Sequence, residues 1–294
     1  MIAVLGATGQ IGRHVARGLA ARSVEAIALV RRPQPGAQPI PQTVADLTDP
    51  GSVRAALRDV NRLFLVTPNV PDQDLLEATA IDAAADAGVT HIVKVSGGAA
   101  SLGPNGTTAT AAAHWRGEQR IEHRGLGFSF LRPSFLQQNL LTTVAPLLAR
   151  TGLLVAPFGH APIAMVDARD VAGCAIAALT DPHPADQAWQ LTGPRGVTFD
   201  DVAAHLGARY LPIPPRAAGR MLTRRGVPAV QVDHAVRMSA YFAAGADRSP
   251  TEDVQRLTGH PARPVQALLD EHRVLFAPAT RLARRLSRTP TPEA

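Results

Sequence analysis

The sequence predicts an α/β fold, a doubly wound parallel sheet with a smaller, mainly helical C-terminal region. Short apolar runs alternate with helical patterns from residue 1 to about residue 132, as a parallel sheet covered by helices requires. A glycine-rich turn joins the first apolar run to the first helical pattern. After Pro133 this alternation ends, and from Thr198 onward the pattern is mainly helical.

Six strands are expected in the first part of the chain. They are placed at residues 2–5, 26–30, 43–47, 62–66, 91–95 and 128–131. The helical patterns between them cover residues 11–19, 52–60, 71–87 and 115–121. Each helix is long enough to connect two parallel strands across one face of the sheet.

The second part of the chain is predicted to form a smaller region. A helix at 134–150 precedes short strands near 153–157, 163–166 and 189–191, and Asp170 is expected to cap the helix that ends at Leu179. Further helices are expected at 199–206, 216–225, 228–244, 252–257 and 265–276. We therefore expect a sheet domain over residues 1–150, to which residues 163–192 return, and a smaller region over residues 151–294.

Composition limits the possible functions. The chain has one cysteine, Cys174, so a disulfide framework and a cysteine-built metal site are excluded, and we expect no metal. No apolar run approaches the length of a membrane span, and a predicted strand starts at once, so we expect a cytoplasmic protein without a leader. The net charge is +6, and the tail after Phe276 contributes half of it. Its helical arginine spacing favours a solvated or partner-facing helix over a nucleic-acid surface.

The first turn has the geometry that binds the diphosphate of a dinucleotide. Gly6, Gly9 and Gly12 follow the first strand at three-residue spacing and lead into the first helix. Gly6 allows a positive φ, Gly9 lets phosphate oxygens approach backbone N–H groups, and Gly12 lets the helix pack closely on the sheet. A glycine-rich turn without a ligand is the alternative. The strand before it and the helix after it favour the binding site.

The end of the second strand indicates which dinucleotide is bound. An NAD site has a carboxylate here that holds the ribose 2′-hydroxyl, whereas this chain has Arg31 and Arg32. A guanidinium matches the additional 2′-phosphate of NADP. The predicted cofactor is therefore NADP(H). A general excess of arginine is the alternative explanation, because Lys94 is the only lysine among 30 basic residues.

Ligands of such sheets lie at the carboxyl ends of the strands. The predicted cofactor site consists of the residues at those ends: Gly6, Thr8, Gly9, Gln10, Ile11, Gly12, Arg31, Arg32, Asp46, Thr67, Pro68, Asn69, Ser96, Gly97, Pro133 and Phe135. Two of these residues have alternative roles. Asp46 faces the adenine or caps a turn, and Ser96 turns the chain or hydrogen-bonds the substrate.

Several segments together match a known family. They are GATGQIG at 6–12, LVRRP at 29–33, DLTDP at 46–50, EQRIEHRGLGFSFLRPSFLQQN at 118–139, VDARDVA at 166–172, DVQRLTGHPAR at 253–263 and the late Phe276. Over nearly its whole length the chain resembles the NmrA-like branch of the atypical short-chain dehydrogenase/reductases. The resemblance implies an NADP(H)-binding Rossmann domain with a small C-terminal domain. Known members include reductases of quinones and triphenylmethane dyes, and redox-sensing regulators that bind the cofactor without catalysis.

The catalytic pair is the main departure from this pattern. Short-chain dehydrogenases commonly carry Tyr-x-x-x-Lys on the helix after the fifth strand, with a glutamate four residues beyond the lysine. Counting back from Glu118 places His114 at the lysine position and Thr110 at the tyrosine position. An aliphatic hydroxyl such as that of Thr110 holds its proton too tightly to serve as the acid. His114 could hold the ribose or relay a proton, or it could be a structural histidine.

Lys94 is unusual because it lies in a predicted central strand, whose neighbours should be apolar on both faces. We expect its ammonium group either to reach the end of the sheet or to pair with a carboxylate. A catalytic role is the third possibility.

Without the tyrosine, hydride transfer is favoured toward acceptors that are already electron-poor. We therefore expect an NADPH-dependent reductase of a quinone-like or conjugated aromatic compound, in secondary metabolism, with Ser96 and His114 as candidate catalytic residues. The expected substrate contacts are Trp115, Gln138 and Asn139, with Phe135, Met221, Met238, Tyr241 and Phe242 in the pocket wall.

Two other functions stay open at this point. One is a non-catalytic NADP(H)-binding redox sensor, and the other is a non-redox isomerase or lyase that keeps the cofactor as a structural group. The expected partner is a small molecule, with no nucleic acid and no membrane. The chain is expected to be a monomer or a homodimer.

Overall fold

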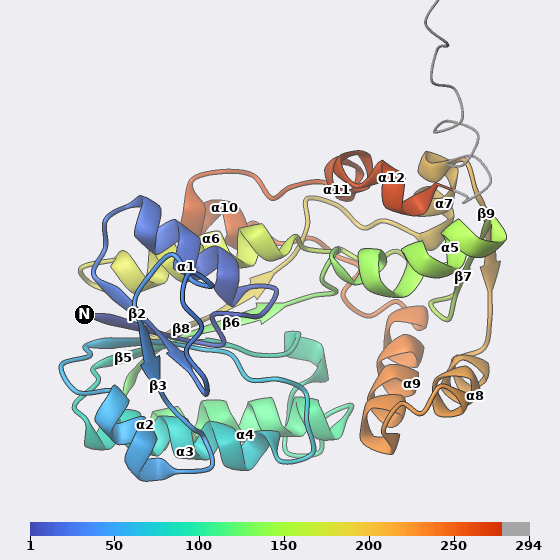
Figure 1. Ribbon diagram of the computed structural model, residues 1–294. Coiled ribbons are helices and arrows are strands. Elements are labelled where there is room, and N and C mark those ends of the chain that lie inside the picture. Colours follow the sequence, from blue (N-terminus) through green and yellow to red (C-terminus); the bar gives the residue numbers. More distant parts are fainter. Residues whose placement is uncertain (278–294) are drawn as a thin grey trace, which may run out of the picture.

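The structure, a computed structural model, describes residues 1–277 of the 294-residue chain. Its main part is a seven-stranded sheet in the order β3-β2-β1-β4-β5-β6-β8 (Figure 1). The strands are β1 (Ile2–Leu5), β2 (Ala26–Val30), β3 (Gln42–Val44), β4 (Arg62–Leu65), β5 (His91–Val95), β6 (Gly127–Pro133) and β8 (Gln187–Leu191). All neighbouring strands are parallel. The predicted doubly wound parallel sheet is therefore confirmed.

Helices cover both faces of this sheet, as Figure 1 shows. The helices on one face are α1 (Gly12–Ala21), α6 (Ala168–Thr180) and α10 (Asp253–Thr258), and those on the other are α2 (Pro50–Ala56), α3 (Gln73–Asp86) and α4 (Ala109–His123). Each face has its own hydrophobic cluster: Val15 and Val171 belong to the first, and Leu57 and Ile81 to the second. The strand order reverses between β1 and β4, and ligands of doubly wound sheets bind at the carboxyl ends of the strands at such a point.

The remaining elements form a smaller region beside the sheet (Figure 1). They are a π-helical turn η2 (Leu140–Val144), α5 (Ala145–Thr151), β7 (Leu153–Ala156), α7 (Phe199–Leu206), β9 (Arg209–Pro212), α8 (Pro215–Arg224), α9 (Ala229–Ala243), α11 (Val265–Glu271) and α12 (Arg273–Phe276), and the short helix η1 (Ala99–Ser101) lies in the loop between β5 and α4. A third hydrophobic cluster stabilises this region. In it, Phe135 contacts Phe158, Phe199 and Phe242 edge-on, with ring centroids 5.3 to 6.3 Å apart.

No helix among residues 1–277 is both long and apolar enough to span a membrane. The predicted basic helix after Phe276 lies outside the described residues. Strand β9 was not predicted, because among residues 1–277 it pairs with β7 alone, in a separate two-stranded parallel sheet. A short strand whose stability depends on one distant partner has little pattern of its own.

The segment after β6 differs from the predicted helix at 134–150. Its first residues form a backbone bridge instead: the N–H of Gln137 donates to the carbonyl of Val166 at 2.8 Å, and the N–H of Val166 donates to the carbonyl of Phe135 at 2.9 Å. Helical structure therefore begins only at Leu140. The predicted strand at 163–166 is likewise wrong, since this segment makes only isolated bridges at Ile163 and Val166.

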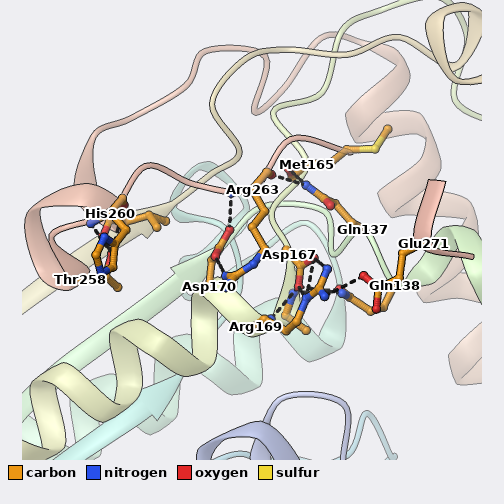
Figure 2. Close-up of polar contacts among 12 residues, drawn as sticks. Gln137, Gln138, Met165, Asp167, Arg169, Asp170, Thr258, His260, Arg263 and Glu271 are labelled. Carbon is orange, nitrogen blue, oxygen red and sulfur yellow. Dashed lines mark hydrogen bonds and ion pairs between the residues drawn. The ribbon is translucent and has the colours of Figure 1, made fainter. Parts of the chain in front are cut away.

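The predicted N-cap of α6 is also wrong. The carboxylate of Asp167 accepts the N–H of Arg169 at 2.7 Å and caps the helix. Asp170 lies in the first turn and is buried, and its carboxylate accepts the N–H of Arg263 at 2.7 Å and also binds the Arg263 guanidinium. Burial raises the pKa of Asp170, although Arg263 opposes this effect. Figure 2 shows that this pair connects α6 to the segment between α10 and α11.

Replacing Arg263 by alanine is predicted to lower the free energy of unfolding by about 2 kcal/mol, because the buried Asp170 carboxylate loses its charged partner. Urea denaturation measures this change. Arg237→Ala is the control: its ion pair with Asp233 is exposed on both sides, so its effect should stay within about 0.5 kcal/mol. Equal effects of the two substitutions would show that the Asp170 pair does not stabilise the fold.

Candidate functional site

A cavity of about 950 Å³ lies at the carboxyl ends of the central strands. Its lining includes Ile11 from the start of α1, Thr67 after β4, Ser96 after β5 and Pro133 at the end of β6. Elements of the smaller region, chiefly η2, α5, β7, α8 and α9, contribute the other wall. The cavity is therefore bounded by the sheet on one side and by the smaller region on the other.

The turn before α1 has the predicted glycine geometry. Gly6 has φ +82°, and its carbonyl accepts the N–H of Gly9 at 2.9 Å. A Cβ on Gly12 would collide with the carbonyl oxygen of Gly6, so only glycine allows the helix to begin this close to the strand. The positive φ at Gly6 and the close contact at Gly12 thus explain why glycine stands at both positions.

Helix α1 begins without a cap. Its N-cap residue Ile11 makes no side-chain cap bond, and its first turn contains no acidic residue. Within the part of the chain that the structure describes, no carbonyl or side chain accepts from the N–H groups of Gln10, Ile11 and Gly12. Free N–H groups at a helix N-terminus form an anion site.

The structure brings many of the predicted cofactor residues together. Those in the cavity lining are Ile11, Thr67, Asn69, Ser96, Gly97, Pro133 and Phe135, and the predicted substrate contact Asn139 lines it as well. Thr8, Gln10, Arg31, Arg32 and Pro68 are exposed residues outside this lining. Asp46 caps a turn, because its carboxylate accepts the N–H and the hydroxyl of Thr48 at 2.9 and 2.8 Å. These bonds, and the nearby charge of Arg31, lower the pKa of Asp46.

Two predicted substrate contacts lie outside the cavity lining. Trp115 is half-buried on α4 and does not reach it. Gln138 is buried, and both ends of its amide bind the start of α6: Nε2 donates to Asp167 at 2.9 Å, and Oε1 accepts the N–H of Ala168 at 2.8 Å (Figure 2). Its amide therefore stabilises the fold.

Some lining residues were not predicted. They include His234 and Asp247, whereas Met221, Met238 and Phe242 line the cavity as expected and Tyr241 does not. His234 lies on α9, and its Nδ1 is 3.1 Å from the hydroxyl of Thr108. No local pattern indicates such residues, because each reaches the cavity through packing between distant segments.

A buried charged cluster lies against the cavity at His114. Lys94 of β5 and Glu77 of α3 form an ion pair with Nζ and Oε2 3.0 Å apart, and their side chains are 0% and 1% exposed. Lys94 Nζ also lies 3.0 Å from Nδ1 of His114, which is buried on α4 and lines the cavity. Glu77 Oε1 accepts from Thr67 Oγ1 at 2.7 Å and from Gln73 Nε2 at 3.1 Å. Lys94 thus pairs with a carboxylate, one of its expected arrangements.

The cluster has a definite charge state at neutral pH. Burial would raise the pKa of Glu77, but Lys94, His114 and Thr67 together hold it well below its usual range. Burial and the adjacent Lys94 charge lower the pKa of His114. Glu77 is therefore a carboxylate and His114 a neutral imidazole.

Two serine hydroxyls lie beside the cavity: that of Ser96 has no hydrogen-bond partner in the described chain, and that of Ser134 has Asp247 as its neighbour. The Oγ atoms of Ser96 and Ser134 are both buried, and both residues belong to the lining. A buried hydroxyl without a partner costs free energy unless a ligand or water satisfies it. These two positions are suited to a polar ligand at the ends of β5 and β6.

Residues 6–182 match the model of a family described as NAD(P)H-binding. The chain belongs to this family. The match includes the glycine turn, the uncapped start of α1 and the cluster at Lys94. It is consistent with the resemblance to the NmrA-like reductases.

Three known proteins are similar over nearly the whole chain. An NAD(P)H azoreductase of Xenophilus azovorans is 34% identical, covering 95% of this chain and 100% of its own length. A (4-alkanoyl-5-oxo-2,5-dihydrofuran-3-yl)methyl phosphate reductase of Streptomyces griseus is 35% identical with the same coverage. The crystal structure of the NADPH-dependent quinone oxidoreductase of Escherichia coli in complex with NADPH has a TM-score of 0.83 and 25% identity, covering 92% of this chain and 99% of that one.

The residues of this chain fit a nicotinamide dinucleotide. Free N–H groups at the start of α1 suit its diphosphate. The unpartnered hydroxyl of Ser96 offers a hydrogen bond at the next strand end. Among residues 1–277 no group of three or more histidine, cysteine or acidic side chains could hold a metal ion.

Proposed function

We propose that the protein is an NADPH-dependent reductase that transfers hydride to an activated, conjugated acceptor such as a quinone, an azo compound or an enone. The main support for this proposal is the set of residues that line the cavity at the strand ends. It is lined by residues that fit the cofactor and by apolar side chains such as Met221 and Met238, but by neither tyrosine of the chain.

Both tyrosines are bound elsewhere in the fold. The hydroxyl of Tyr210 donates to the carbonyl of Gly159 at 2.9 Å, and that of Tyr241 donates to Asp247 at 3.1 Å. Burial raises the pKa of Tyr210 to about 12, and burial with the charge of Asp247 raises that of Tyr241. Neither phenol therefore replaces the acid that a ketone reductase positions on its substrate.

An electron-poor acceptor reduces the need for such an acid. Conjugation spreads the negative charge that hydride transfer creates, so correct placement against the cofactor supplies much of the rate. The names of the relatives support this substrate class: an azo group, a quinone and an oxo-dihydrofuran with an alkanoyl substituent all contain a conjugated, electron-poor double bond.

Ser96, His114 and Asn139 are the proposed contacts of the reacting end. All three residues line the cavity. Ser96 follows the carboxyl end of β5, and His114 faces that end. Ser96 has an unpartnered hydroxyl that can donate to an acceptor oxygen or to the cofactor. The apolar wall of α8 and α9 suits a flat aromatic body.

A panel of acceptors tests the proposal. With NADPH, the purified protein is expected to reduce a neutral quinone, an azo dye and a conjugated enone, and to reduce a simple ketone at least about a hundredfold more slowly, because the ketone needs a positioned acid. Absorbance of the reduced nicotinamide follows the reaction, and mixtures without protein correct for the spontaneous rate. Tight NADPH binding without oxidation by any acceptor would contradict the proposal.

The choice of NADPH is proposed to depend on Arg31. This exposed guanidinium follows β2, and its charge acts on Asp46 at the end of β3, where the adenosine end of a dinucleotide lies in a Rossmann fold. Arg32 is the next residue and is equally exposed.

Arg31→Asp is predicted to weaken NADPH binding tenfold or more and NADH binding far less, because NADH lacks the 2′-phosphate that the carboxylate repels. Titration calorimetry with both nucleotides measures this difference. Arg32→Asp shows whether the neighbouring guanidinium shares the role, and Arg209→Asp on β9 controls for the change in net charge. If Arg31→Asp leaves NADPH affinity at the value of the unmodified protein, the 2′-phosphate is held elsewhere.

A further inference from the structure

Asp247 is the only acidic side chain in the lining of the cavity, among the residues that the structure describes. It lies in the turn after α9 and is half-buried. The lining around it is mainly apolar. A carboxyl group in such surroundings acts strongly on the charge of an entering ligand, because charges there are screened less than in water.

The backbone holds Asp247 in an uncommon conformation. Its φ is +55°, in the left-handed region that few residues other than glycine adopt. Its carbonyl accepts the N–H of Ala164 at 2.9 Å, which fixes the turn to a distant segment of the chain. A left-handed residue other than glycine costs free energy, and such residues gather at functional sites. The fold therefore pays for the placement of this side chain.

The side chain extends toward the carboxyl ends of β5 and β6. Its Oδ2 atom lies 2.7 Å from the place that a Cβ on Gly98 would occupy, and Gly98 lies in the loop after β5. The carbonyl oxygen of Pro133, the last residue of β6, lies 3.6 Å from the same place. A side chain at position 98 would collide with the carboxylate, so glycine there leaves the space that Asp247 fills.

Two hydroxyls favour the ionised form of this carboxyl group. Tyr241 donates to Oδ1 at 3.1 Å, and Ser134 is the other neighbour. Burial raises the pKa of Asp247, and both hydroxyls oppose this effect. In the part of the chain that the structure describes, no basic side chain shifts the pKa of Asp247. The cavity thus contains a half-buried negative charge without a counter-charge from residues 1–277.

The basic residues of the lining do not supply that counter-charge. Arg150 in the last turn of α5 and Arg225 directly after α8 are exposed and belong to the wall of the smaller region. Burial lowers the pKa of His114 and of His234, so both imidazoles are neutral at neutral pH. A cationic group on a ligand is the partner that remains for Asp247.

We propose that Asp247 selects the acceptor by its charge, and that the preferred acceptor carries a cationic nitrogen group on its conjugated system; this inference rests on the proposed function. The attraction acts on the bound acceptor before hydride transfer. A sulfonate, carboxylate or phosphate group at the same position is repelled. Asp247 thus determines specificity and takes no part in the transfer of hydride or proton.

Three azobenzenes that differ in one para substituent test the proposal by binding alone. The substituents are a trimethylammonium group, a tert-butyl group of the same shape and a sulfonate group. Asp247→Asn is expected to weaken binding of the cationic compound about tenfold, to change binding of the neutral one less than about twofold and to strengthen binding of the anionic one. Equilibrium dialysis with the full-length protein saturated with NADP⁺ measures the three dissociation constants without hydride transfer.

Asparagine suits this test because it has nearly the same shape as aspartate and also tolerates a left-handed backbone. Its amide oxygen can still accept from Tyr241. Asp233→Asn on α9 is the matched control, because it removes the same charge at an exposed position outside the lining. This control is expected to leave all three dissociation constants unchanged.

Three results would overturn the proposal. Equal losses with all three compounds would show that Asp247 only stabilises the turn after α9. No change with any of them would remove Asp247 from the binding site. An altered ratio of NADP⁺ to NADPH affinity, without discrimination between the azobenzenes, would show that the carboxylate faces the cofactor instead.

Turnover separates this inference from the proposed function. With NADPH, Asp247→Asn is expected to lower kcat/KM for the cationic azobenzene about tenfold, mainly through KM, since the contact forms before hydride transfer. If the unmodified protein binds the cation selectively through Asp247 but reduces none of the compounds, the proposed function fails and the charge selection stands. If Asp247→Asn reduces all three compounds as the unmodified protein does, the charge selection fails and the proposed function stands.

Discussion

The hydrogen bonding of one buried ammonium group constrains how His114 lies at the cavity. Lys94 lies in a central strand, where its charge has no access to water. It is stable there because Glu77 from α3 and His114 from α4 converge on it. Both helices cover the same face of the sheet, and Gly117 lets α4 approach closely enough. The position of His114 at the cavity therefore depends on a charge balance beneath it.

The two walls of the cavity differ in the residues that form them. The sheet side carries the glycine turn, the strand-end hydroxyls and His114, which suit a dinucleotide and the reacting atoms. The smaller region supplies apolar side chains from α8 and α9 and has its own aromatic cluster around Phe135. On the proposed function, different elements would hold the cofactor and the acceptor, which would let the acceptor differ between relatives on one scaffold.

Local patterns predict this fold well where neighbouring residues determine the structure. The glycine turn and the order of strand and helix follow from short-range geometry. The cost of burying a charge made pairing with a carboxylate one of three arrangements expected for Lys94, and its partner Glu77 comes from a different element. The errors involve distant partners. Asp170 binds Arg263, which is 93 residues away, and Gln138 binds the start of α6. The helix predicted at 134–150 begins late because Val166 pairs with its first residues. No short window of sequence contains these contacts.

The most direct test of the account is to follow the transferred hydrogen. NADPH deuterated at both C4 positions of the nicotinamide is mixed with the protein and a cationic triphenylmethane dye, and the product is examined by mass spectrometry. One deuterium is expected on the central carbon of the reduced dye. A reduced dye without deuterium, formed while the cofactor is oxidised, would contradict direct hydride transfer in this cavity.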